Sequence, residues 1–139
     1  MSPDGRWLAY TSDESGRDEI YIQSFPAAGA KVQVSNSGGD QAVWSRNGKA
    51  VFFRGEAAVQ EASFGAGPPL AVGKPHVLFP DKFESPQVGG HTGYDVFPDG
   101  RFLMIQSPDE RQNAGGPRLE FIFVFNWFDE LKRIAPSGK

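Results

Sequence analysis

Cysteine is absent from this 139-residue sequence, and histidine occurs only twice. The lack of cysteine excludes disulfide bridges, cysteine-ligated zinc, iron–sulfur clusters and thiol catalysis. The longest uninterrupted apolar run, Phe121–Phe125, is far shorter than the roughly 20 residues needed to cross a bilayer, so no membrane partner is predicted. The formal net charge is -3, which gives no basic surface for nucleic acid. Residues 1–5 have no basic-then-apolar signal pattern, and the sequence leaves the compartment undetermined.

The residues that are abundant favour an all-β fold. The chain contains 12 Phe, 17 Gly and 11 Pro. Many aromatic residues together with many turn formers favour short strands joined by tight turns over long helices. With no cysteine to form cross-links, stability must come from the burial of apolar side chains.

A short motif occurs three times, at residues 2–10, 44–53 and 96–105. Its glycines are Gly5, Gly48 and Gly100, so the intervals are 43 and 52 residues. A period of this size is typical of one four-stranded blade of a β-propeller. Proline, then Asp or Asn, then Gly suits the successive positions of a tight turn, and the apolar run that follows predicts a strand.

Strands are predicted wherever β-branched and aromatic residues lie between turn signals. The predicted blades are residues 2–37, 38–80 and 91–126, followed by a short C-terminal helix over 127–134, in one segment that spans 1–139. The predicted strands cover residues 7–11, 19–25, 31–35, 42–45, 50–54, 57–64, 76–79, 93–97, 101–107 and 119–126. A Gly/Pro-rich loop is expected over residues 65–74.

These residues also carry a family resemblance. The run Ser-Pro-Asp-Gly-Arg-Trp-Leu-Ala-Tyr-Thr-Ser at the start of residues 2–22, and Gly-Gly-Asp-Gln-Ala-Val-Trp-Ser-Arg-Asn-Gly at 38–48, resemble TolB-like β-propeller repeats. Residues 94–104 and 123–133 are similar to the C-terminal propeller of bacterial eukaryotic-like serine/threonine protein kinases. The resemblance implies a ring of about six blades, a sensor or scaffold role, and ligand binding at the channel mouth. Relatives of this kind often act outside the cytoplasm.

About three blades make only half of such a ring. The first predicted blade lacks its innermost strand and the third its outermost strand, which leaves unpaired backbone groups at open edges. Two copies arranged head to tail would complete a closed ring, so a homodimer is expected. Apolar residues such as Phe121, Phe123 and Phe125 would be buried by that closure.

No set of residues predicts catalysis, a metal or a cofactor. The kinase signatures are missing, and the sequence has no nucleophile elbow and no His-Glu-x-x-His motif. His76 lies in a predicted strand, where packing or simple exposure is expected. The acidic run 13–19 has Arg17 in its middle and lacks the alternating ligands of a calcium loop, so it is interpreted as a solvated turn. The chain is therefore predicted not to be an enzyme.

The best binding candidates are four polar residues expected near the channel mouth, because propellers bind through their loops. They are Gln41, His91, Tyr94 and Asp95. Their partner would be a protein or a small ligand. The alternative is that the chain is the propeller part of a larger enzyme, either a kinase-linked sensor or the gating domain of a prolyl-oligopeptidase-type hydrolase.

Overall fold

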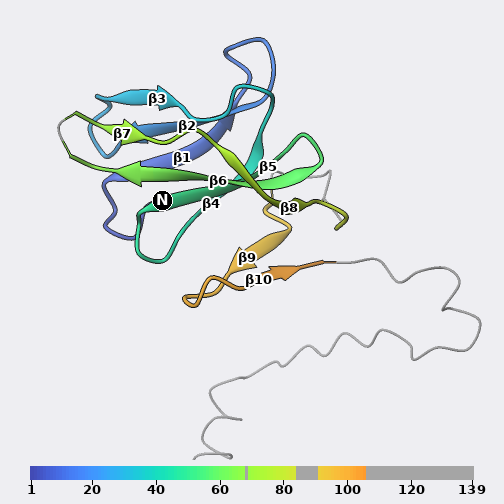
Figure 1. Cartoon of the computed structure of the whole chain (residues 1–139). Coiled ribbons are helices and arrows are strands. Elements are labelled where there is room, and N and C mark those ends of the chain that lie inside the picture. Colours follow the sequence, from blue (N-terminus) through green and yellow to red (C-terminus); the bar gives the residue numbers. More distant parts are fainter. Residues whose placement is uncertain (68, 84–90, 106–139) are drawn as a thin grey trace, which may run out of the picture. The chain divides into compact units, whose positions relative to one another are not determined.

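The computed structural model describes residues 1–67, 69–83 and 91–105, all of which belong to the first of two units, Met1–Ser107 and Pro108–Lys139. Within these ranges the chain forms ten strands and no helix, as the all-β prediction expected (Figure 1). The strands are β1 (Trp7–Ser12), β2 (Glu19–Ser24), β3 (Lys31–Gln33), β4 (Asp40–Trp44), β5 (Ala50–Gly55), β6 (Ala58–Gly65), β7 (Ala71–Val72), β8 (His76–Pro80), β9 (Tyr94–Val96) and β10 (Phe102–Met104).

The strands form three antiparallel sheets. Sheet 1 has the order β1-β2-β3, and sheet 3 consists of β9 and β10. Sheet 2 has the order β4-β5-β6, with β7 and β8 both pairing with β6. The predicted strands are confirmed in the described part of the chain, with one addition. Strand β7 lies in the predicted loop, where Val72 pairs with Phe64. The predicted strand 119–126, the helix 127–134 and the last two residues of the predicted strand 101–107 lie outside the described residues.

A first hydrophobic cluster lies between sheet 1 and sheet 2. Ile20 and Ile22 of β2 are fully buried in it, as are Val51 and Phe53 of β5. Trp44 and Trp7 both contact the ring of Phe64 edge-on, at centroid distances of 4.9 Å and 5.2 Å. Because adjacent residues of a strand point to opposite faces, these residues define the faces through which the two sheets pack.

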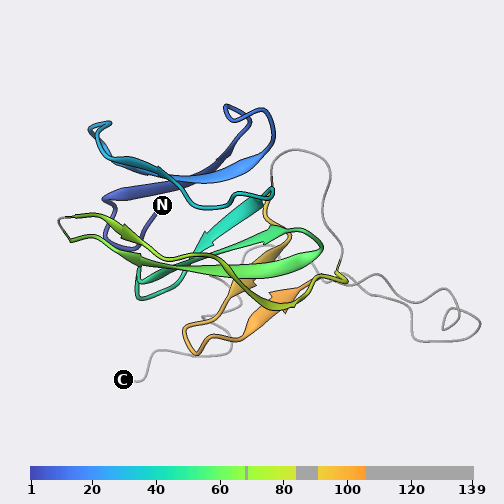
Figure 2. The same cartoon turned by 45° about the horizontal axis from the view of Figure 1, so that its top comes forward.

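A second, smaller cluster lies between sheet 2 and sheet 3. Phe52 projects from the opposite face of β5 and packs with Tyr94 and Val96 of β9. Phe102 of β10 contacts the ring of Phe52 edge-on at 5.1 Å. Sheet 2 is therefore covered on both faces, and the three sheets stack in chain order, as the two views in Figures 1 and 2 show.

The three repeated turns share the conformation of their glycine. Each glycine has a left-handed φ, which glycine adopts without steric cost. The φ values are 71° at Gly5, 69° at Gly48 and 85° at Gly100. Each glycine N–H also donates to the carbonyl three residues earlier, Gly5 to Ser2 at 3.0 Å, Gly48 to Ser45 at 2.9 Å and Gly100 to Phe97 at 3.0 Å.

A serine hydroxyl completes the first two turns. In the second, the Ser45 hydroxyl donates to Asn47 Oδ1 and accepts from the backbone N–H of Ala50, both at 2.9 Å. Ser2 makes the same pair of bonds with Asp4 and Trp7. These side-chain bonds fix the register in which the following strand begins.

The third turn has no such hydroxyl and closes one residue earlier. Ser45 N–H donates to the carbonyl of Ala50, two residues after the glycine. Phe97 N–H donates instead to the carbonyl of Arg101, one residue after the glycine, at 2.8 Å. A one-residue change of register moves every side chain of a strand to the other face. Phe102 therefore faces sheet 2, and Leu103 faces away from it.

Candidate functional site

Unusual backbone conformations gather at one end of sheet 2. Among residues 1–67, 69–83 and 91–105, three residues other than glycine have a left-handed φ, namely Gln41 at 52°, Glu56 at 51° and Ala57 at 57°. Gly55 pairs with Ala58, so Glu56 and Ala57 form the whole of the β5–β6 turn. A two-residue hairpin with both residues left-handed is a type I′ turn, for which Asn-Gly is the preferred sequence. Such residues are costly and are often found at functional sites.

Gln41 owes its position to a bulge in β4. The register with β5 shifts between Asp40 and Val43, so that extra residues lie opposite one residue of β5. A bulge redirects a side chain away from the regular sheet. Here the side-chain Oε1 of Gln41 accepts a hydrogen bond from the backbone N–H of Gly93 at 2.8 Å. The backbone carbonyl of Gln41 accepts a hydrogen bond from the Tyr94 hydroxyl at 2.9 Å. Two predicted site residues, Gln41 and Tyr94, are thus brought into contact.

Arg54 lies beside this pair and is only 4% exposed. Its Nε is 3.0 Å from Asp81 Oδ2, and its Nη2 donates to Asp81 Oδ1 at 3.3 Å. The guanidinium carbon also lies 5.8 Å from the centre of the Tyr94 ring. Asp81 is held in turn, because its N–H donates to the carbonyl of Ala57 at 2.8 Å and its Oδ1 accepts the N–H of Phe83. The buried ion pair therefore joins β5, the β5–β6 turn and the end of β8.

An open hollow of about 340 Å³, the Arg54 hollow, lies over this ion pair. Four of its lining residues carry carboxylates and only Arg54 is cationic. Burial is the main cause that raises the pKa of Asp40, and the charges of Asp18 and Asp81 add to it, while Arg54 opposes it. Burial likewise raises the pKa of Tyr94 far above its ordinary range, so its phenol remains a hydrogen-bond donor. The lining residues are Asp18, Gly38, Gly39, Asp40, Arg54, Gly55, Glu56, Ala57 and Asp81.

A buried carboxylate, that of Glu19, binds the backbone of Gly38 in one wall of the hollow. Glu19 is 1% exposed, and it accepts the Nε–H of Arg17 at 2.7 Å and the N–H of Gly38 at 3.1 Å. It also accepts the hydroxyl of Ser35. Burial raises the pKa of Glu19, but the bonds from Ser35, Gly38 and Arg17 outweigh it, so the pKa is lower than usual. A Cβ at Gly39 would lie 2.9 Å from Ser35 Oγ, which shows how closely this wall packs.

The other two predicted site residues lie elsewhere. The Asp95 side chain is 64% exposed, on the face of β9 opposite to Tyr94, and pairs with Arg46 Nη2 at 3.5 Å. His91 is exposed and makes no hydrogen bond or ion pair within the described residues. The structure therefore brings together Gln41 and Tyr94, but not Asp95 or His91.

Arg54, Asp81 and Asp40 are not among the four site residues predicted from the sequence. One signal was available for Arg54, which follows the apolar run 50–53 and shares the face of Phe52 in a strand whose two faces are both buried. A charged residue in such a place requires a partner. Nothing in the sequence indicated that Asp81, at the end of β8, would be that partner.

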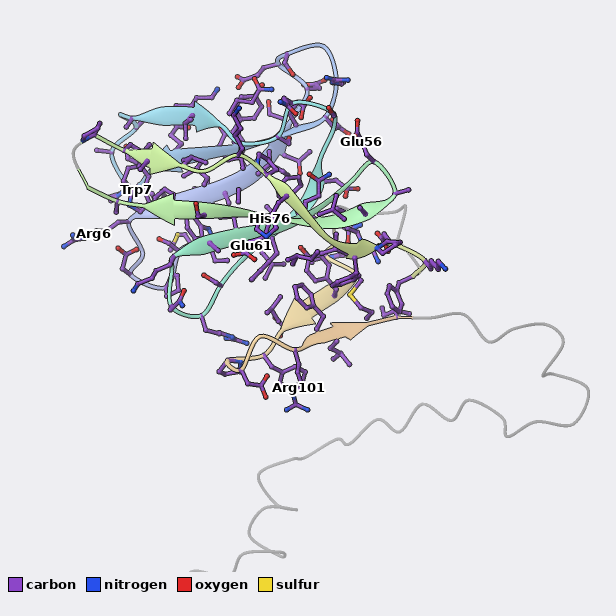
Figure 3. All side chains as sticks on the ribbon, viewed as in Figure 1. Arg6, Trp7, Glu56, Glu61, His76 and Arg101 are labelled. Carbon is purple, nitrogen blue, oxygen red and sulfur yellow. The ribbon has the colours of Figure 1, made fainter. Side chains whose placement is uncertain are left out.

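One more polar pair lies on the outer part of sheet 2. His76 Nε2 is 3.8 Å from Glu61 Oε2, and the His76 side chain is 61% exposed (Figure 3). In the part of the chain that the structure describes, no group of three or more His, Asp or Glu side chains is placed to hold a metal ion. Among the same residues, no helix has the length and apolar character needed to span a membrane.

Comparisons of the chain with protein-family profiles, with curated proteins and with solved structures gave no match.

Proposed function

We propose that this chain is a non-catalytic β-propeller module of the TolB-like type, a scaffold for binding, and that two copies complete one ring. The observation that carries the proposal is the stacking of three sheets in chain order. In sheets 2 and 3, one of the repeated glycine turns joins the first two strands. In a stack of this kind each sheet has one face for the preceding sheet and one for the following sheet. The two outermost faces then lack a neighbour.

The face of sheet 1 that points away from sheet 2 supports this reading. Leu8 occupies the same place after its turn as Val51, which faces the preceding sheet. Leu8 is nevertheless 37% exposed. On the same face, Tyr10 and Tyr21 stack at a centroid distance of 6.0 Å. The same face also carries Gln23, Gln33 and Lys31, whose ammonium lies 4.8 Å from the centre of the Tyr21 ring, so it offers another sheet a mixed aromatic and polar surface.

The far face of sheet 3 supports it from the other end. Leu103 and Ile105 alternate with Phe102 and Met104, which pack toward sheet 2. The exposed fractions of Leu103 and Ile105 are 59% and 55%. A contact between the Leu103 face of one copy and the Leu8 face of another would continue the order of the stack. Such a heterologous contact, made twice around a two-fold axis, closes a ring.

The edge of β1 is consistent with the same arrangement. In sheet 2, β4 pairs with the side of β5 that faces away from β6. The corresponding side of β1 carries no strand among the described residues, although Ser2 N–H already donates to the carbonyl of Trp7 at 2.7 Å. Unpaired strand edges favour association with another chain.

Binding is assigned to the loop end that holds Gln41, Tyr94 and the Arg54 hollow. Loops carry binding residues on a rigid scaffold, and here a buried ion pair and strained turns fix those loops. A non-catalytic role agrees with a sequence that contains no cysteine and two histidines, of which His76 lies on an outer strand. The partner would be a protein or a small ligand that enters at this end.

Mass in solution tests the assembly. Light scattering over a dilution series should give twice the 15.2 kDa mass of one chain. Leu103→Arg places a charge in the proposed contact and should produce monomers. Val77→Arg is the matched control, because Val77 is 60% exposed on β8 of a sheet that already has both neighbours.

A dimer that Val77→Arg leaves intact and Leu103→Arg dissociates is the expected result. A well-folded monomer at all concentrations would contradict ring closure by a second copy. A dimer that survives Leu103→Arg would contradict the assignment of this face. Circular dichroism of each variant checks that the strands are retained.

A further inference from the structure

A groove of about 410 Å³ lies between the second and third repeated turns. Its floor is apolar and is formed by Ala50, Phe52 and Val96. Arg46 and Lys49 of the second turn line one side, and Pro98 of the third turn lines the other. A concave volume of this size with an apolar floor and few polar groups is typical of a ligand pocket.

The corresponding space between the first and second turns is nearly filled. Only about 130 Å³ remains there, lined by Ser2, Pro3, Asp4 and Trp7 of the first turn. The larger groove is lined by the residues at the same four places of the second turn, Ser45, Arg46, Asn47 and Ala50.

One difference between the two spaces is an aromatic side chain. The Trp7 indole packs edge-on against Phe64 in the smaller hollow, with the centroids 5.2 Å apart. In the larger groove the same position is Ala50, whose methyl group leaves the space open. In the first repeat, the space between two such turns therefore holds a planar aromatic group.

One side of the groove carries two cations, Arg46 and Lys49, on a chain of net charge -3. Arg46 is already engaged, because its Nε donates to the carbonyl of Val96 at 3.3 Å and its Nη2 lies 3.5 Å from Asp95. Lys49 is exposed, and its ammonium has no ion pair among the described residues. Glu61 is the one carboxylate in the lining and lies beside His76, at 3.8 Å.

We propose that this groove binds an aromatic group that carries a carboxylate. The ring lies over Ala50 in the position that Trp7 occupies in the first repeat, and the carboxylate pairs with Lys49. Cation and carboxylate at the rim of an apolar floor give orientation as well as affinity. The site lies within one copy of the chain and does not depend on ring closure.

The test is a titration of the full chain with 3-phenylpropionate, followed by the amide resonances of the labelled protein. Shifts are expected at Ala50, Phe52 and Val96, with saturation in the millimolar range for so small a ligand. The neutral analogue 3-phenylpropanamide isolates the contribution of the carboxylate. A capped peptide with Phe beside Asp distinguishes a polypeptide source of the group from a free acid, according to which of the two binds more tightly.

Two variants make the result specific. Ala50→Trp rebuilds the first repeat and should abolish binding. Lys49→Glu should weaken binding of the acid about fivefold, the factor expected for one exposed charge pair. This variant provides the test if Ala50→Trp does not fold. Lys82→Glu is the matched control, since Lys82 is exposed and lies outside the groove, and it should leave binding unchanged.

Several outcomes would overturn the proposal. They are an absence of shifts with both the acid and the peptide, equal binding of the neutral amide, and undiminished binding to folded Ala50→Trp. Light scattering on the same samples keeps this result separate from ring closure. A monomer that binds the acid would contradict the dimer and support the groove.

Discussion

The left-handed backbone of the β5–β6 turn can be tested by substitution of one residue. Ala57 has a φ of 57°, a conformation that costs an L-residue roughly 1–2 kcal/mol and costs glycine little. Glycine also makes the unfolded chain more flexible, which costs about 0.5–1 kcal/mol in a structured position. The difference favours glycine, so Ala57→Gly should stabilise the protein by about 0.5–1 kcal/mol.

The neighbouring alanine is the matched control. Ala58 is buried, pairs with Gly55, and has an ordinary negative φ. Ala58→Gly loses a buried methyl group and gains chain flexibility, so it should destabilise by about 1 kcal/mol or more. Two chemically identical substitutions at adjacent positions are thus expected to change the free energy of unfolding in opposite directions.

Urea unfolding measures both changes. Trp7 and Trp44 pack in the first hydrophobic cluster, so their fluorescence reports the loss of tertiary structure. At one fixed protein concentration, Ala57→Gly should raise the unfolding midpoint and raise Tm by about 2–4 °C. If Ala57→Gly destabilised as much as Ala58→Gly, the left-handed conformation of the turn would be refuted.

Three further predictions concern buried polar groups. Arg54→Met leaves Asp81 buried without its cation and should cost about 3–5 kcal/mol in urea unfolding, of which Arg54→Met with Asp81→Leu should recover most. The pKa of Glu19 is lowered on folding, so its stabilising contribution is present above the ordinary value of 4.5 and is lost as the pH falls through the folded value. Glu19→Gln should therefore weaken the pH dependence of stability in the acid range, measured as unfolding midpoints between neutral and acid pH. Ser45→Ala removes the hydroxyl bonds of the second turn and should cost about 1 kcal/mol, whereas Ser37→Ala, at an exposed serine, should have little effect in the same assay.

The turns and strands could be predicted because their signals are local. Asn47-Gly48 and Asp99-Gly100 each precede an apolar run, and the glycine conformation that such turns require is the one observed. Strand β7 was not predicted, since Ala71 and Val72 lie in a Gly/Pro-rich stretch and gain their order from pairing with β6. The Glu56-Ala57 turn carries no turn signal, because glutamate and alanine do not favour a left-handed backbone.

The candidate site at this end of sheet 2 could be predicted only in part, because Gln41, Tyr94 and Arg54 meet through the topology. Tyr94 and Gln41 are 53 residues apart, and their contact depends on a bulge that no short pattern marks. The adjacency of Asp95 and Tyr94 in the sequence predicts that both lie at the same site. Alternation along β9 puts the two side chains on opposite faces, so Asp95 pairs with Arg46 and Tyr94 lies beside Arg54. Predicting such a site requires the face of each strand as well as its existence.

The residue at which the repeated turn closes decides which residues of the following strand are buried. Where serine is present, at Ser45, the hydroxyl bonds the second residue after the glycine and the hairpin closes there. Phe97 has no hydroxyl, and its hairpin closes one residue earlier. In the serine register Phe102 would point away from sheet 2, whereas in the observed register it packs on Phe52. The same shift turns Leu103 outward, so the exposed apolar face of sheet 3 accompanies the earlier closure of its hairpin.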